Sequence, residues 1–204
     1  MSESASDQSQ PSGRTPAPPS TLTETGKQSN PVIAGFEILN KVGQGGMGAV
    51  FRARQISMDR IVALKILPKK LAADPACKER FLREARVSAK LNHVNLINGI
   101  ECGESGGYTF FAMEFVEGQT AKDLLKQRGR MKIEEVVGIM RQISEALGYA
   151  HSRQLIHRDV KPENIMVSSN GAAKLCDLGL ARSTEKSQDA GLTLAGQAVG
   201  TPYY

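Results

Sequence analysis

The sequence predicts an α+β fold of two lobes: a small, mostly antiparallel β-lobe with one helix, and then the beginning of a helical lobe. Three observations support this prediction. Segments typical of strands dominate residues 34–114, and one helical segment interrupts them. Apolar residues at three- and four-residue spacing appear after Gly118, where the second lobe, residues 119–204, is expected. The 204 residues, 40% of them hydrophobic, suffice for one domain or two small lobes.

The first 33 residues differ from the rest in composition. They are rich in Ser, Gln, Thr and Pro, and Leu22 is their only large aliphatic residue before Val32. Because such a segment cannot bury a core, a disordered tail is expected over residues 1–33.

The first lobe is predicted to contain five strands and one helix. The strands are expected where β-branched and apolar residues concentrate, at residues 36–42, 49–54, 60–67, 96–102 and 108–114. Asp74 followed by Pro75 is a typical helix start, so a helix is expected from there to about Leu91. Its apolar side would consist of Phe81, Leu82, Ala85 and Ala89.

The second lobe is expected to be mainly helical. A short helix is predicted over residues 120–128 and a long one over residues 133–152. The long helix has an apolar side formed by Ile133, Val136, Met140, Ile143, Leu147 and Ala150. Asn170-Gly171 is a strong hairpin signal, and short strands are expected on either side of it, at residues 165–167 and 173–176.

Composition excludes several classes of protein. The sequence has no run of 18 apolar residues and no secretory signal at its start, so we expect no membrane segment. The formal net charge of +5 fits a solvated surface, and no basic cluster with interleaved aromatic residues suggests nucleic acid. Three widely spaced cysteines, Cys77, Cys102 and Cys176, indicate reduced thiols in a cytoplasmic protein.

Gly43, Gly45 and Gly48 form a G-x-G-x-x-G pattern. In a dinucleotide-binding fold this pattern opens a helix and is followed by an acidic residue about 20 positions later. Here residues 49–54 alternate like a strand, and Lys65 stands near the position of the acid. A glycine hairpin that folds its backbone N–H groups over phosphates fits better, and a plain tight turn is the alternative.

Lys65 lies inside an apolar strand, on the same face as Ile61 and Ala63. A buried lysine is costly unless it is paired, and Glu84 on the following helix is the candidate partner. The alternative is a lysine whose stem is buried and whose ammonium reaches water.

Two polar segments carry the strongest chemical signal. His157-Arg158-Asp159-Val160-Lys161-Pro162-Glu163-Asn164 precedes Asp177-Leu178-Gly179, with a predicted hairpin between them. Two carboxylates and an amide on adjacent loops can hold Mg²⁺ and orient a hydroxyl beside it.

Together, these motifs resemble the Hanks-type, eukaryotic-like serine/threonine protein kinases of bacteria, over about Phe36 to Tyr204. Leu178 stands where the family usually has Phe. The resemblance implies a protein-kinase-like fold, ATP and Mg²⁺ as cofactors, and Ser or Thr hydroxyls of proteins as substrates, with self-phosphorylation as a further expectation.

The resemblance assigns roles to the polar residues. Asp159 would orient the attacking hydroxyl and accept its proton, and Lys161 would stabilise charge on the γ-phosphate. Lys65, tied to Glu84, would grip the α- and β-phosphates. The expected Mg²⁺ ligands are Asn164 and Asp177.

The resemblance also implies an adenine site between the lobes. Met113 would be its gatekeeper side chain, and the backbones of Glu114 and Val116 would hydrogen-bond the base. The other residues expected to line the nucleotide are Val42, Gly43, Gly45, Gly48, Val50, Ala63 and Met166.

Residues 181–200 are polar and glycine-rich and are expected to form a mobile loop. By resemblance this is an activation loop in which Thr193 is the candidate phosphosite, and Arg158 would bind the phosphate.

The family continues beyond the Gly-Thr-Pro-Tyr-Tyr sequence found at residues 200–204, so the chain is expected to be a kinase domain truncated after the activation loop. Two functions remain open: an ATP-dependent serine/threonine protein kinase acting in signalling, and a truncated, non-catalytic nucleotide-binding fragment or scaffold.

Overall fold

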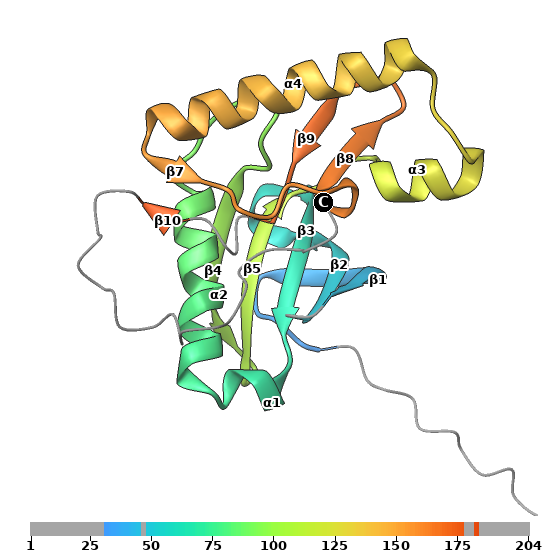
Figure 1. Cartoon of the computed structure of the whole chain (residues 1–204). Coiled ribbons are helices and arrows are strands. Elements are labelled where there is room, and N and C mark those ends of the chain that lie inside the picture. The colour runs from blue at the N-terminus through green and yellow to red at the C-terminus, as the bar shows by residue number, and fades with distance from the viewer. Residues whose placement is uncertain (1–30, 46–47, 178–181, 184–204) are drawn as a thin grey trace, which may run out of the picture.

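The computed structural model describes residues 31–45, 48–177 and 182–183, and it has the predicted α+β architecture (Figure 1). The first lobe is an antiparallel sheet of five strands in the order β1-β2-β3-β5-β4. These strands are β1 Phe36–Gly45, β2 Gly48–Gln55, β3 Arg60–Leu67, β4 Gly99–Ser105 and β5 Tyr108–Glu114. A short 3-10 helix, Ile56–Met58, joins β2 to β3.

The register of the sheet separates two faces. Val50 lies opposite Lys65, and Ala63 lies opposite Met113. Since directly opposed residues share a face, these four side chains lie on the same side of the sheet. The other face carries the lobe's apolar cluster, formed by Ile33, Phe36, Phe51, Ala53, Val62, Leu64, Ile66, Phe110 and Ala112.

The main helix of this lobe, α2 (Pro75–Ser88), lies along the face that carries Lys65, after a single helical turn, α1 (Lys69–Ala72) (Figure 1). It begins as predicted: the Asp74 carboxylate accepts a hydrogen bond from the backbone N–H of Ala76 at 3.0 Å. Phe81 and Ala85 of α2 pack with Leu67 and Phe111, which fixes the helix against the sheet.

Four predicted boundaries in this lobe were wrong by three residues. β1 ends at Gly45 and β4 at Ser105, each three residues later than predicted; the other two boundaries have a visible structural cause. α2 ends at Ser88, before the predicted Leu91, and the Ser88 hydroxyl donates to the Ile97 carbonyl at 3.0 Å. β4 begins at Gly99 instead of residue 96, because Leu96 forms an isolated parallel bridge with Leu175 of the second lobe. These last two differences arise from long-range contacts that local sequence patterns do not report.

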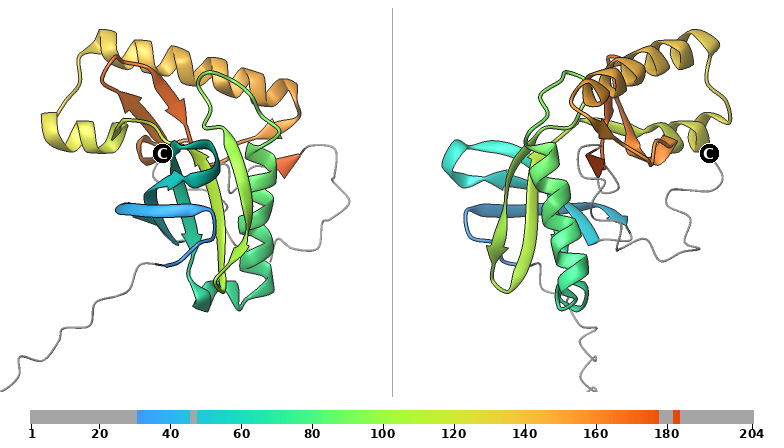
Figure 2. Two further views of the ribbon diagram at one scale, coloured as in Figure 1. Left: turned by 180° about the vertical axis from the view of Figure 1, so that it is seen from behind. Right: turned by 60° about the vertical axis from the view of Figure 1, so that its left-hand side comes forward.

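The second lobe combines helices with small sheets (Figures 1 and 2). Its helices are α3 (Ala121–Arg128), α4 (Ile133–Ser152) and a 3-10 turn, Pro162–Asn164. One sheet has the order β6-β8-β9, and β7 pairs with β10. These strands are β6 Gly118–Thr120, β7 Leu155–Ile156, β8 Ile165–Ser168, β9 Ala173–Leu175 and β10 Arg182–Ser183.

The bounds of α4 were predicted correctly, but its buried side only in part: Ile143 and Ala150 are buried and Leu147 packs against the core, as predicted. Its buried residues are Ile139, Ile143, Ala146 and Ala150, which pack over β8 and β9. Ile133, Val136 and Met140, predicted on the apolar side, are 76%, 41% and 49% exposed. At about 100° per residue the two sets lie on adjacent sides of the helix, and spacing alone did not show which side meets the sheet. Within the described ranges, no helix is long and apolar enough to cross a membrane.

Gly118, at the junction of the lobes, has no room for a side chain. A Cβ at this position would lie 2.3 Å from the Val167 carbonyl oxygen. We expect Gly118→Ala to lower the free energy of unfolding by about 1–3 kcal/mol, measured by urea denaturation, since backbone atoms would have to shift. The control is Gly148→Ala in α4, where nothing lies within 4 Å of the added Cβ and the change should be neutral or stabilising. Equal stabilities of the two variants would contradict this expectation.

Candidate active site

Lys65 joins two carboxylates from different parts of the chain. Its ammonium lies 2.9 Å from Oε1 of Glu84 on α2 and 2.6 Å from Oδ1 of Asp177, which follows β9. The residues Lys65 and Glu84 are 8% and 4% exposed. The pairing predicted between Lys65 and Glu84 is therefore present, and Lys65 also brings Asp177 of the second lobe to the sheet.

Burial and charge act on these groups in opposite directions. Burial would lower the pKa of Lys65, but the attraction of Glu84 and Asp177 outweighs it, so the pKa is raised. Burial raises the pKa of Glu84 to about 7, although Lys65 opposes the rise. For Asp177 the effect of burial is outweighed by Lys65, and the pKa is lowered. As pH falls, Glu84 is thus the first of the two carboxylates to be protonated.

A second polar cluster surrounds Asp159, in the loop between β7 and β8. Asn164, which is 4% exposed, donates its side-chain N–H to the Asp159 backbone oxygen at 2.8 Å and to Oδ2 at 3.0 Å. The Lys161 ammonium lies 2.9 Å from the same Oδ2. This hydrogen bond to Asp159 raises the pKa of Lys161. The Asp159 carboxylate is thereby held in one orientation by an amide and a cation.

His157 connects the two clusters. Its Nε2 lies 3.1 Å from the Cys176 carbonyl oxygen, and its Nδ1 accepts the Asp159 N–H at 3.3 Å. The Asn164 carbonyl accepts the N–H of Cys176 at 2.9 Å. The loop with Asp159 and the segment before Asp177 are therefore fixed to each other through His157.

Two residues of these loops have unusual backbones. Arg158 and Asp177 both have φ of 67°, in the left-handed region that favours glycine. Such a conformation costs about 1–3 kcal/mol in a residue with a side chain, and it is typical of functional sites, where the surroundings enforce it.

Asn164 and Asp177 supply the kind of ligands that Mg²⁺ prefers, an amide oxygen and a carboxylate. The Asn164 amide nitrogen is held by Asp159, so the amide has a defined orientation. The Asp177 side chain is 48% exposed, which leaves it accessible to an ion. The donor set therefore fits Mg²⁺. Among the described residues, no group of three or more His, Cys, Asp or Glu side chains could hold a metal ion.

The residues predicted to contact the nucleotide are distributed over both lobes. Val50, Ala63, Lys65 and Met113 share one face of the sheet, as described above. The β-lobe also holds Val42, which is 48% exposed, and three glycines, Gly43, Gly45 and Gly48. Glu114 ends β5 and Val116 follows it, whereas Met166 lies on β8 of the second lobe. Residues 46–47, Leu178 and Thr193 lie outside the described residues.

Sequence reasoning missed two contacts near these residues. Asn164 was assigned only as a metal ligand, but its amide also orients Asp159. Lys174 of β9 lies 2.8 Å from Glu114 Oε1, and the two residues are 60 positions apart in the sequence. Nothing in the local pattern around a lysine in a three-residue strand indicates so distant a partner.

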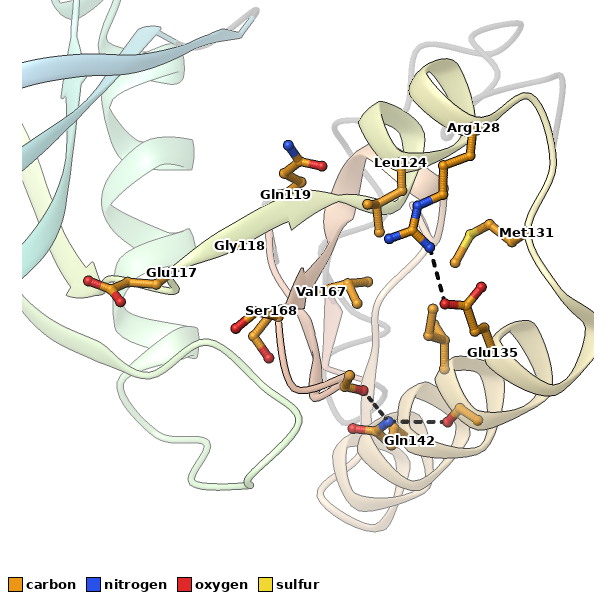
Figure 3. A pocket seen from close by; sticks show the side chains of 14 residues that line it. Glu117, Gly118, Gln119, Leu124, Arg128, Met131, Glu135, Gln142, Val167 and Ser168 are labelled. Atoms are coloured by element: carbon orange, nitrogen blue, oxygen red, sulfur yellow. Dashed lines mark hydrogen bonds and ion pairs between the residues drawn. The ribbon is translucent and has the colours of Figure 1, made fainter.

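A pocket of about 590 Å³ lies elsewhere in the second lobe, between α3, α4, β6 and the β8–β9 turn (Figure 3). An ion pair of 3.1 Å between Arg128 and Glu135 crosses one side of it. Gln142 donates to the Gly171 carbonyl at 3.0 Å and thereby attaches the β8–β9 turn to α4. None of the predicted catalytic or metal-binding residues lines this pocket.

Burial lowers the pKa of His157, so the folded protein favours the neutral ring. Its contribution to stability is fully present above the ordinary histidine pKa of about 6.5 and is lost as pH falls through the lowered pKa. We therefore expect the parent to lose unfolding free energy relative to His157→Gln as pH falls below about 6.5, a comparison that cancels the opposite effect of Glu84, whose raised pKa favours the folded protein at lower pH. Urea denaturation between pH 5 and 8 measures this, with exposed His151→Gln as the control. Parallel profiles for His157→Gln and the parent would show that another group titrates.

The two lobes and the polar clusters between them define a protein kinase domain, and comparison with known families agrees. The profile described as "Protein kinase domain" matches residues 36–204. The chain therefore belongs to the protein kinase family.

Its relatives include bacterial serine/threonine kinases. The chain is 43% identical over 169 residues to serine/threonine-protein kinase pkn3 of Myxococcus xanthus, covering 80% of this chain and 31% of that protein. It is 40% identical over 164 residues to PknL of Mycobacterium tuberculosis, covering 80% and 40%. It is 36% identical over 169 residues to PrkC of Bacillus subtilis, covering 83% and 26%. The chain thus spans well under half the length of these relatives.

Proposed function

We propose that the protein is an ATP-dependent serine/threonine protein kinase that transfers the γ-phosphate of ATP to hydroxyl groups of other proteins in signalling. The observation that carries this proposal is the link between two clusters: Lys65 with Glu84 and Asp177, and Asp159 with Lys161 and Asn164. His157 connects these clusters. This arrangement combines, within one site, groups that can bind phosphate, groups that can bind a metal ion and a carboxylate that can accept a proton.

Asp159 is the proposed base. It orients the substrate hydroxyl and accepts its proton while the hydroxyl oxygen forms a bond to the γ-phosphorus and the bond to the β–γ bridging oxygen breaks, releasing ADP. Lys161, 2.9 Å from Asp159, is positioned to stabilise charge on the transferred phosphoryl group. Asn164 and Asp177 would hold Mg²⁺, which would neutralise charge on the phosphates of ATP.

The β-lobe would bind the rest of the nucleotide. Lys65, held by Glu84, binds the α- and β-phosphates, and the backbone N–H groups of Gly43, Gly45 and Gly48 lie over them. The adenine ring would contact Val42, Val50, Ala63, Met113 and Met166, with backbone hydrogen bonds at Glu114 and Val116. The shared face of Val50, Ala63, Lys65 and Met113 supports this assignment.

Self-phosphorylation at Thr193 is part of the proposal. A phosphate adds about −1.5 to −2 charges and can pair with Arg158, which directly precedes the proposed base. Arg158 is exposed and has the unusual backbone described above, so its guanidinium is accessible to such a group. The three cysteines are free thiols, which fits a proposed cytoplasmic location.

The alternative function is a non-catalytic nucleotide-binding fragment or scaffold. The kinase and the nucleotide-binding fragment both predict Mg·ATP binding, only the kinase predicts transfer, and a scaffold requires neither. The test is calorimetric titration with Mg·ATP together with transfer of labelled γ-phosphate to a generic protein substrate. Binding with transfer supports the kinase, binding without transfer supports the nucleotide-binding fragment, and absence of binding overturns both and leaves the scaffold.

A further inference from the structure

Glu114 and Lys174 form an ion pair that connects the two lobes outside the clusters described above. The Lys174 ammonium lies 2.8 Å from Oε1 and 3.0 Å from Oε2 of Glu114. The side chain of Lys174 is 17% exposed and that of Glu114 is 32% exposed, so the pair is only partly screened by water. By contrast, the surface pair Arg54–Glu37 has side chains that are 47% and 51% exposed.

The Glu114 end of the pair is built into the sheet of the first lobe. Glu114 is the last residue of β5 and lies opposite Val62 of β3. Its N–H donates to the Asn98 carbonyl at 2.9 Å. The residues that follow, 115–117, which we call the linker, lead from this point into β6 of the second lobe.

The Lys174 end is built into the second lobe, beside the proposed nucleotide site. Lys174 lies opposite Met166 and three residues before Asp177. Met166 is the second-lobe residue proposed to contact the adenine ring, and we call it the floor of the adenine site. The residue after Lys174, Leu175, exchanges backbone hydrogen bonds with Asn95 and Ile97, at 2.8 and 3.0 Å. These backbone hydrogen bonds join the lobes independently of the ion pair, so the lobes can stay together when the ion pair is removed.

The outer side of the linker is not packed. A pocket of about 310 Å³ lies against it, lined by the linker itself, by Glu114 and Lys174, and by residues of the β8–β9 turn. Because little protein supports the linker from this side, its position relative to Met166 depends on how the residue before it, Glu114, is anchored.

We propose that Glu114 and Lys174 are positioning residues, and that their ion pair sets the spacing between the backbone of the linker and the Met166 floor, and hence the affinity for the adenine ring. This inference rests on the proposed function, because it assumes that a nucleotide binds between these elements. The pair acts on the base and not on the phosphates. Among the described residues, the structure shows no interaction of Lys65 or Asp177 with Glu114 or Lys174.

The test uses the 204-residue chain with Glu114→Gln, Lys174→Met and the double variant. Affinities for Mg·ATP and for adenosine are measured by titration, with folding monitored by circular dichroism. We expect each single change to weaken both ligands by about tenfold, a typical effect for coupled contacts, and the double variant to be no weaker than either single one. The charge-preserving Lys174→Arg should bind nearly as the parent does, and Glu37→Gln is the surface-pair control.

The outcomes separate this inference from the proposed function. If the parent does not bind Mg·ATP, the proposed function is overturned. If the parent binds and all variants bind both ligands within twofold of it, the function stands and the positioning role is overturned. A loss for Mg·ATP without a loss for adenosine also overturns it, because the pair would then act through the phosphates. If Lys174→Met does not fold, Glu114→Gln and Lys174→Arg give the same decision.

Discussion

Asp159→Asn is expected to reduce phosphoryl transfer by about 10²–10⁴-fold while Mg·ATP affinity stays near that of the parent. The amide has the size of the carboxylate and can still accept the hydrogen bond from Asn164, which in the parent is 3.0 Å long. It cannot accept the proton of the attacking hydroxyl, and it no longer attracts the Lys161 ammonium. The loss should therefore appear in turnover and not in nucleotide binding.

Single-turnover transfer of labelled γ-phosphate and calorimetric titration with Mg·ATP measure the two quantities separately. The matched control is Glu134→Gln, an exposed carboxylate in the first turn of α4 that lies outside the site. Near-normal transfer by Asp159→Asn would assign the base to another residue. A parallel loss of nucleotide affinity would instead show that Asp159 acts through the binding site.

Lys65→Met is the second change with a large expected effect, because it removes the cation between two carboxylates. Glu84 is 4% exposed, and its Oε2 has no hydrogen-bond partner among the described residues. Breaking a buried pair by removing one partner typically costs about 3–5 kcal/mol. That is a large part of the usual stability of about 5–15 kcal/mol. Mg·ATP affinity should fall as well, because the contact with the phosphates is lost.

The stability of Lys65→Met should also depend on pH in a definite direction. The pKa of Glu84 is already raised to about 7 with Lys65 present, and removing the ammonium raises it further. A carboxylate with a raised pKa favours folding when it is protonated, so the variant should be more stable at pH 6 than at pH 8. Adding Glu84→Gln should restore part of the stability at pH 8 but not the nucleotide affinity.

Urea denaturation at the two pH values and nucleotide titration provide the measurements, with Lys90→Met, an exposed lysine beyond the end of α2, as the control. Unchanged stability at pH 8 would mean that leaving the Glu84 carboxylate without the Lys65 ammonium costs the folded protein little free energy. Unchanged Mg·ATP affinity in a folded variant would remove Lys65 from the proposed phosphate site.

Much of the fold was predictable because local signals agreed with one another. β3 and β5 and the long helix α4 were assigned to the residue, and the N-cap of α2 followed from Asp74 and Pro75. In two places where prediction was wrong, distant contacts decided the outcome. β4 starts late because Leu96 pairs with Leu175 instead, and α4 buries Ile139 and Ala146 instead of Ile133 and Val136.

The sequence by itself determined the kinds of groups in the site and their order along the chain: a glycine loop, a strand lysine, a helical glutamate and two polar loops. Each of these signals spans only a few residues, so spacing and residue type are enough to detect it. Only the tertiary structure decided that Lys65 holds Glu84 and Asp177 together, that Asn164 orients Asp159, and that Lys174 reaches Glu114. The pairs formed by Lys65 and Lys174 depend on distances between residues 19 to 112 positions apart, which packing sets and local sequence does not contain.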